Sequence, residues 1–442
     1  MSDALTAAAP SGFLRGRGLP LRRLGDAALW LAVFLGGFVI AEPAPYELLV
    51  ALLMVIWLLA GLKFRREIGP MIVLLLLFMA GGIMAVPFAR DLPAGTMHMA
   101  VAAFLGATAM FYAALITERP DRVVIVERAY IASAFFCALL GILGFFDLIP
   151  GGEAFVRNLR AKGTFEDPNV FGPFLLLPTL LLLRRVMTGA PSTWGLALIA
   201  LPVLVLGIFL SFSRGAWGMM AVAGVVLYLL LLVNEQRPAR RFRLLLLAGA
   251  GVLGIALLLL VALSIDQVSD LFAERAKLVQ PYDGSRLGRF ARYSLGFEMA
   301  MERPLGLGPL EFNKYFPEDE HNVYMKAFTA YGWLGGIVWP MLMLWTLVAL
   351  GRQLFRHRPW TPFAQCLFAV LLVHVFVGVV IDIDRWRHLF LLIGLAWGLI
   401  AADKLYDRRH AFRHRSQPSV DSPTTQALRR RSEAVREGAV GQ

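Results

Sequence analysis

The sequence has few charged residues and almost no cysteine. Charged side chains make up 17% of its 442 residues, against about 25% in an ordinary soluble protein. Both cysteines, Cys137 and Cys366, lie inside apolar runs, which argues against a disulfide framework and a cysteine-based metal site. The chain also lacks a P-loop, an HExxH pair and a GxSxG turn, so the usual motifs of ATP-driven transport, zinc hydrolysis and serine hydrolysis are missing.

Long hydrophobic runs take up most of the chain instead, and a helix needs about 20 apolar residues to cross a bilayer. Twelve runs are candidates: 27–41, 46–62, 69–88, 95–117, 124–147, 168–183, 193–212, 215–233, 243–264, 322–350, 361–381 and 387–404. They predict an all-α, polytopic integral membrane protein with about 12 transmembrane helices and one large outer loop that contains helices. The run 168–183 is short, and 322–350 is long enough to tilt or to kink at Pro340.

The formal net charge of +12 would suggest nucleic acid in a soluble protein. In a membrane protein it has a different source, because Lys and Arg concentrate on cytoplasmic loops. With a cytoplasmic N-terminus, the inner segments before the C-terminal tail hold 18 Lys and Arg residues and the short outer loops hold 7. We therefore expect both termini in the cytoplasm and no nucleic-acid partner.

This orientation divides the chain into five parts. They are a cytoplasmic lead, nine transmembrane helices, a large outer loop that carries candidate site residues described below, three further transmembrane helices and a basic, disordered cytoplasmic tail near anionic headgroups. In that order they cover 1–26, 27–264, 265–321, 322–405 and 406–442.

Two arginine motifs lie on the predicted outer face. Arg214 follows Ser213 in a tight turn between two apolar runs, either as a snorkelling arginine at a helix end or as one that the turn directs toward the bundle. In the large loop, Arg286, Phe290 and Tyr293 recur at helical spacing, so an arginine leads an aromatic stripe. Such a helix suits a membrane surface, and its guanidinium groups suit a phosphate because they are planar and have several donors.

The segment 318–322 places three acids beside His321 and Asn322. Nearby acids favour a charged imidazole, and histidine is the most common general base. A structural histidine and a cation site are the alternatives for the same cluster. The charges of 382–388 are expected to pair with one another.

Ionisable residues inside the runs are few, namely His98, Glu127, Arg128 and His374. An ion-coupled transporter is expected to bury several such groups near the middle of the membrane. The residues alone therefore favour an enzyme at the outer surface, while a transporter and a lipid-binding scaffold stay open.

Four motifs together give a resemblance to a known family, and it covers about residues 120–400. They are Thr164-Phe165-Glu166-Asp167-Pro168-Asn169, Ser213-Arg214-Gly215, Ser285-Arg286 with Pro304-Leu305-Gly306-Leu307-Gly308, and His321-Asn322-Val323-Tyr324 with Tyr331-Gly332-Trp333-Leu334-Gly335. In their order and spacing they resemble the O-antigen ligase and O-antigen polymerase superfamily of bacterial inner-membrane glycosyltransferases. Asp167 before Pro168 is also a typical helix start, which is the structural interpretation of that motif.

The resemblance implies an enzyme that takes a glycan from undecaprenyl pyrophosphate on the periplasmic face of the inner membrane. The acceptor hydroxyl belongs to lipid A–core in a ligase and to another lipid-linked repeat in a polymerase. No nucleotide sugar, cofactor or metal is implied, and the expected partners are the glycan donor, the acceptor and membrane lipids. We favour the ligase, with an O-antigen or exopolysaccharide polymerase as the alternative and a polysaccharide transporter or flippase as an alternative of another class.

The resemblance also implies residue roles. Arg214 and Arg286 would hold the pyrophosphate, with Arg289 as a helper, and His321 would take the proton of the acceptor hydroxyl in an inverting displacement. Phe290 stands where the family often has tryptophan, and Arg286 fits the second arginine best because it follows Ser285. The residues expected to support the site are Asp319, Glu320, Asn322, Asp167 and Asn169, with the Asp319–Glu320 pair expected to orient or tune His321.

Overall fold

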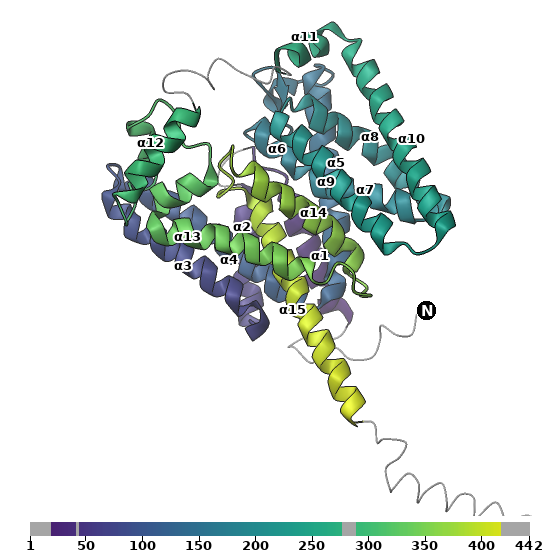
Figure 1. The fold of residues 1–442 in the computed structure, drawn as a ribbon, viewed down its shortest axis with the longest axis horizontal. Helices are drawn as coiled ribbons and strands as arrows, with labels where there is room; N and C mark the ends of the chain where they lie inside the picture. Colours follow the sequence, from purple (N-terminus) through teal and green to yellow (C-terminus); the bar gives the residue numbers. More distant parts are fainter. Residues whose placement is uncertain (1–18, 41–43, 276–288, 417–442) are drawn as a thin grey trace, which may run out of the picture.

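The computed structural model describes residues 19–40, 44–275 and 289–416. Each of the twelve hydrophobic runs coincides with a helix or, for 168–183, with two consecutive helices (Figure 1). These helices are α1 (Leu19–Leu35), α2 (Pro45–Leu59), α3 (Gly69–Ala85), α4 (Leu92–Glu118), α5 (Val123–Phe145), α6 (Pro168–Phe174), α7 (Leu176–Thr188), α8 (Gly195–Leu210), α9 (Arg214–Asn234), α10 (Pro238–Leu263), α13 (Val323–Gly351), α14 (Thr361–Val377) and α15 (Arg387–Ser416).

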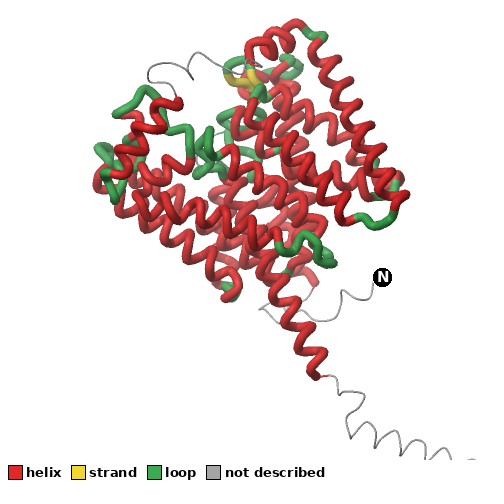
Figure 2. The backbone as a smooth tube through the Cα atoms, in the orientation of Figure 1, coloured by secondary structure: helices red, strands yellow, loops and turns green. Residues whose placement is uncertain are grey.

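The remaining elements are short. The large loop contributes α11 (Asp266–Arg275) and α12 (Arg289–Met301), so the expectation that it contains helices is met (Figure 2). A two-residue hairpin pairs β1 (Val156–Arg157) with β2 (Arg160–Ala161). The 3-10 helices of the described ranges are η3 (Arg66–Ile68), η4 (Val86–Phe88), η5 (Pro120–Arg122), η6 (Gly152–Phe155), η7 (Pro191–Thr193) and η8 (Phe312–Lys314).

Within the described part of the chain, eight helical segments are long and apolar enough to cross a membrane. The predicted count of about twelve includes α1, α2, α8 and α14, which are 15 to 17 residues long and so measure about 22–26 Å at about 1.5 Å per residue. Along α10 only Leu244 and Ala262 are buried, and such an apolar outward surface needs lipid around it. The chain is an all-α polytopic membrane protein, as predicted.

Among the differences from the expected runs, three concern the start of α1, the end of α15 and a break inside α13. α1 begins at Leu19 rather than near 27, because the lead already contains good helix formers. α15 continues to Ser416, so 406–416, predicted as the start of a disordered tail, is helical. α13 leaves helical geometry at Gly332, with φ 66° and ψ −174°, and not at Pro340, which stays inside the helix.

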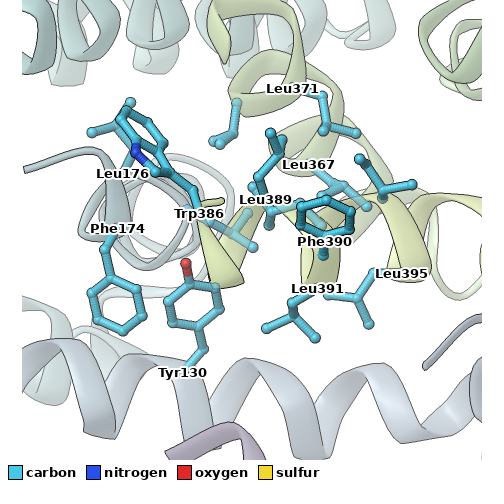
Figure 3. Close-up of a cluster of buried hydrophobic side chains, with 14 of the residues drawn as sticks. Tyr130, Phe174, Leu176, Leu367, Leu371, Trp386, Leu389, Phe390, Leu391 and Leu395 are labelled. Carbon is cyan, nitrogen blue, oxygen red and sulfur yellow. The ribbon is translucent and has the colours of Figure 1, made fainter. Parts of the chain in front are cut away.

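The core lies where α4 and α15 run along each other. Glycines on α15 permit the close approach, since a Cβ at Gly394 would come within 2.6 Å of the Ala109 carbonyl oxygen. Leucine and aromatic side chains of α6, α7, α14 and α15 fill the adjoining space around Tyr130 of α5 (Figure 3). This packing fixes the ends of α14 and α15, from which the candidate site is built.

Candidate active site

Arg214 is the first residue of α9 and follows a strained turn. Phe212 is buried and has a φ of 44°, a left-handed conformation that is uncommon for a bulky residue. Ser213 caps the helix, because its hydroxyl accepts a hydrogen bond from the Ala216 N–H at 3.3 Å. The turn therefore holds the half-buried Arg214 at a fixed place on the bundle rim.

Arg160 joins this turn to the predicted Asp167 motif. Its Nε donates to the Ser211 carbonyl at 2.8 Å, and its Nη2 donates to Asn169 Oδ1 at 2.8 Å. Asp167 accepts from the Asn169 N–H at 2.7 Å and caps α6, so its interpretation as a helix N-cap is confirmed. The guanidinium group of Arg160 thus joins two segments that are more than 40 residues apart in sequence.

His321 lies two residues before the start of α13 and has a left-handed backbone conformation, with φ 47°. Asn322 caps the helix, because its side-chain oxygen accepts from the N–H groups of Tyr324 and Met325 at 3.0 and 3.1 Å. The hydroxyl of Tyr293 on α12 donates to the His321 carbonyl at 2.9 Å. Strained non-glycine residues are common at functional sites, where the surroundings hold them in place.

Asp382, in the connection from α14 to α15, lies next to His321. Its carboxylate accepts a hydrogen bond from the Asn322 N–H at 2.9 Å. Burial raises the pKa of Asp382, while the positive charge of Lys326 and a charged His321 act in the opposite direction. Asp382 is the carboxylate that the structure brings to the backbone of the His321 turn.

Lys326 of α13 holds the α14–α15 connection in place through ion pairs. Its Nζ lies 3.1 Å from an oxygen of Asp384 and 3.9 Å from an oxygen of Asp382. Burial disfavours the ionised form of Asp384, but Lys326 outweighs it and lowers the pKa of that carboxyl. The Tyr331 hydroxyl donates to Asp384 at 3.0 Å. Lys326, Asp384 and Tyr331 therefore form a polar cluster inside the bundle.

Asp382, Asp384 and Arg387 therefore pair with residues of other helices, so the expectation that the charges of 382–388 pair with one another is wrong for these three. Besides the Lys326 pairs, Arg387 makes an ion pair with Glu47 of α2. The reason is geometric: 382–386 is a short irregular connection whose acids point into the bundle, where Asp384 is 1% exposed.

The end of α14 brings the arginine and histidine motifs together. A Cβ at Gly215 would lie 3.4 Å from Val377, and the next residue, Gly378, accepts from the Val323 N–H at 2.8 Å. The Tyr293 hydroxyl also contacts the carbonyl oxygen of Val379 at 3.2 Å. The Arg214 turn, the His321 turn and α12 therefore all meet residues 377–379.

The second arginine motif falls partly outside the described residues. Arg286 lies in 276–288, and Arg289 begins α12 with a side chain that is outside the described part. Arg289 precedes Tyr293 by one helical turn, about 6 Å along the axis. The helix packs on α13, where Phe297 meets Phe328 edge to face at 6.0 Å.

The acids that precede His321 in the sequence contact residues other than His321. Glu318 pairs with the buried Arg292 at 2.6 Å, and the carbonyl of Asp319 accepts from Arg292 at 3.3 Å. Glu320 is buried and accepts from the Thr329 hydroxyl at 2.6 Å. Burial, together with the nearby Asp382 carboxylate, raises the pKa of Glu320 to about 7. A role of the Asp319–Glu320 pair in tuning His321 stays a prediction.

Sequence reasoning missed Arg160, Arg292, Lys326 and Asp382 as parts of this arrangement. A signal existed for Lys326, since a lysine one turn inside an apolar run requires a nearby acid. Arg160 carried no such signal, because the sequence shows it only as one of several basic residues in an outer loop.

Residues 197–339 match the family described as O-antigen ligase. This match supports the resemblance to the O-antigen ligase and polymerase superfamily and, with it, a membrane glycosyltransferase of that type. None of the curated proteins gives a significant match to the chain.

Proposed function

We propose that the protein transfers a glycan from undecaprenyl pyrophosphate to an acceptor hydroxyl on the periplasmic face of the bacterial inner membrane. The acceptor that we favour is lipid A–core, which makes the protein an O-antigen ligase. An O-antigen or exopolysaccharide polymerase is the alternative within the same superfamily.

The observation that carries the proposal is the position of the family match. The stretch 197–339 contains all four residues with a proposed catalytic or pyrophosphate-binding role, Arg214, Arg286, Arg289 and His321. The contacts of 377–379 with both the Arg214 turn and the His321 turn support a single site that these motifs share.

The arginines would act on the leaving group. As the bond between the anomeric carbon and the pyrophosphate oxygen breaks, its electron pair passes to the pyrophosphate. Fixed guanidinium groups beside that oxygen stabilise the growing negative charge without any reorganisation. Arg214 is suited to this because the Ser213 cap and the Phe212 turn fix its backbone. Arg286, with Arg289 as helper, would complete the pyrophosphate site without a metal ion.

His321 would act on the acceptor. The acceptor oxygen forms the new bond to the anomeric carbon from the side opposite the pyrophosphate, which inverts the configuration. Its proton passes to the imidazole, and undecaprenyl pyrophosphate leaves. Asp382, which holds the adjacent N–H of Asn322, stabilises the imidazolium electrostatically.

The test of this chemistry is transfer by a His321→Ala variant reconstituted with a lipid-linked donor and an acceptor. We expect a loss of about a hundredfold or more, as is usual for a general base. The matched control is His357→Ala, an exposed histidine between α13 and α14, which should transfer like wild type. Full activity of a folded His321→Ala variant would overturn the general-base role.

Arg214→Lys tests the pyrophosphate site separately. Lysine keeps the positive charge but loses the planar, bidentate set of donors. We expect weaker donor use with unchanged insertion of the helices. Wild-type behaviour of Arg214→Lys would remove planar phosphate recognition from the proposal.

Deletion of the gene in its native host separates ligase from polymerase. Long glycan on the carrier beside bare lipid A–core identifies a ligase. Lipid A–core with a single repeat identifies a polymerase. An unchanged pattern in both pools would rule out both acceptors and redirect the search to capsule, exopolysaccharide or protein glycosylation.

A further inference from the structure

A basic cavity lies at the end of the bundle opposite His321. Its volume is about 600 Å³, within the range of about 300–1,000 Å³ that is usual for ligand sites. It forms where the connection between α2 and α3 meets the far end of α15. The lining residues are Lys63, Phe64, Arg65, Arg66, Glu67, Leu405 and Arg408.

The position of the cavity follows from α15. Arg387 begins this helix beside the candidate site, and Arg408 lies 21 residues later, which is about 32 Å along the axis. The hydrocarbon core of a bilayer is about 30 Å thick. The cavity is therefore level with the headgroups of the leaflet opposite the candidate site, which the charge distribution predicts to be the cytoplasmic leaflet.

Four cations and one carboxylate line the cavity. The carboxylate is that of Glu67, which is 5% exposed and makes ion pairs with Arg66 and Arg408. Glu67 thus holds η3 against α15 and leaves an excess of positive charge.

Lys63 and Arg65 supply that excess. Both are exposed, and no other side chain of the described ranges makes an ion pair or a hydrogen bond with either of them. Two other cations at this end of the bundle are matched by acids. Arg356 and Arg358 pair with Asp403 and Asp407 in a network of two cations and two carboxylates.

Apolar surface continues from the cavity into the membrane region. Phe64 in its wall is 45% exposed, and Leu59 at the end of α2 is 83% exposed. A molecule that fits both features has a phosphate group and hydrocarbon chains. Basic pockets at this level are suited to the headgroups of anionic lipids.

We propose that this cavity binds the phosphate headgroup of an anionic phospholipid, with Lys63 and Arg65 as its main cationic contacts and the acyl chains along α2. The site is separate from glycan transfer and stands whether or not the proposed function is right.

The experiment measures lipid binding to the full chain purified in a neutral detergent. Phosphatidylglycerol, cardiolipin, phosphatidylcholine and inorganic phosphate are added separately, and bound lipid and Tm are recorded. We expect the two anionic lipids to bind and to raise Tm, and phosphatidylcholine and phosphate to have little effect. Equal stabilisation by phosphatidylcholine, or by free phosphate at the same concentration, would overturn the proposal.

Paired variants locate the binding. Lys63→Gln with Arg65→Gln should weaken binding of the anionic lipids by on the order of tenfold. Arg237→Gln with Arg240→Gln removes the same charge from the exposed start of α10, where Arg240 pairs with Glu235 at the surface, and should bind like wild type. An equal loss in both pairs would show a general attraction to the basic surface and not a site. Both pairs are exposed, so Tm without lipid should match wild type, and the single Arg65→Gln variant gives an intermediate loss.

Discussion

The Asp382 carboxylate lies 2.9 Å from the backbone N–H of Asn322, across the junction between the α14–α15 connection and the start of α13. The N–H of Asn322 is otherwise an unsatisfied donor at a helix start. The contact fixes the residue after His321 and places a negative charge beside the imidazole. One carboxylate therefore has a structural and an electrostatic effect on the same turn.

Two substitutions of Asp382 separate these effects. Asp382→Ala removes both, and we expect a loss of about 1–3 kcal/mol in the free energy of unfolding together with a clear loss of transfer. Asp382→Asn keeps an oxygen for the Asn322 N–H, so its stability should stay near wild type and its remaining loss of transfer measures the charge. Asp270→Asn, on the exposed surface of α11, is the control. Wild-type stability and transfer in Asp382→Ala would contradict both roles.

Arg160 provides the second prediction. Arg160→Ala leaves the buried carbonyl of Ser211 and the side chain of Asn169 without this donor, at an expected cost of about 1–3 kcal/mol. Transfer should fall as well, because Ser211 begins the turn that precedes Arg214. Arg157→Ala is the matched control, since its guanidinium donates to the carbonyl of Glu166 at the exposed surface. The prediction would be wrong if Arg160→Ala had the same Tm and the same transfer rate as the control.

The fold could be predicted from the sequence because hydrophobicity alone specifies membrane helices. Each of the twelve runs coincides with helix, and one run is divided at Leu175 into α6 and α7. The ends of the helices are harder to predict, because α1 and α15 extend into basic segments that are polar but favour helix. For the run 322–350 the sequence predicts a tilt or a kink at Pro340, since proline is the common cause of kinks, whereas the break lies at Gly332.

The candidate site was predicted less completely. Arg214, His321 and Asp167 follow from local motifs, and the cap of Asp167 on α6 follows from two adjacent residues. Asp382 and Arg160 act through contacts 60 and 51 residues away in sequence. Such contacts depend on how α14 and α8 end in space, which no local pattern encodes.

The raised pKa of Glu320 predicts a dependence of stability on pH. Because the folded pKa, about 7, lies above the ordinary value of 4.5, the folded state binds a proton more tightly than the unfolded state. The stability contribution is therefore complete below about pH 4.5 and is lost as the pH rises toward 7. Glu320→Gln keeps an oxygen for the Thr329 hydroxyl and cannot ionise, so its Tm at pH 8 should exceed that of wild type. The two proteins should converge at pH 4.5, and a constant difference across this range would contradict the assignment.

Gly332 provides the last prediction, because its break in α13 accommodates the segment that follows α12. Its φ of 66° is strained for other residues, and a Cβ there would lie 2.7 Å from the carbonyl oxygen of Pro304. That carbonyl accepts from the Trp333 N–H at 2.9 Å, so the clash would also disturb the contact. We expect Gly332→Ala to cost about 1–3 kcal/mol and to reduce transfer by displacing α12, which carries Tyr293 to the His321 carbonyl. Gly224→Ala is the control: it lies inside α9 with open space around it, and alanine there should raise stability by up to about 1 kcal/mol. Thermal unfolding of the two variants side by side checks the prediction, and a Gly332→Ala variant as stable as Gly224→Ala would show that the break does not depend on glycine.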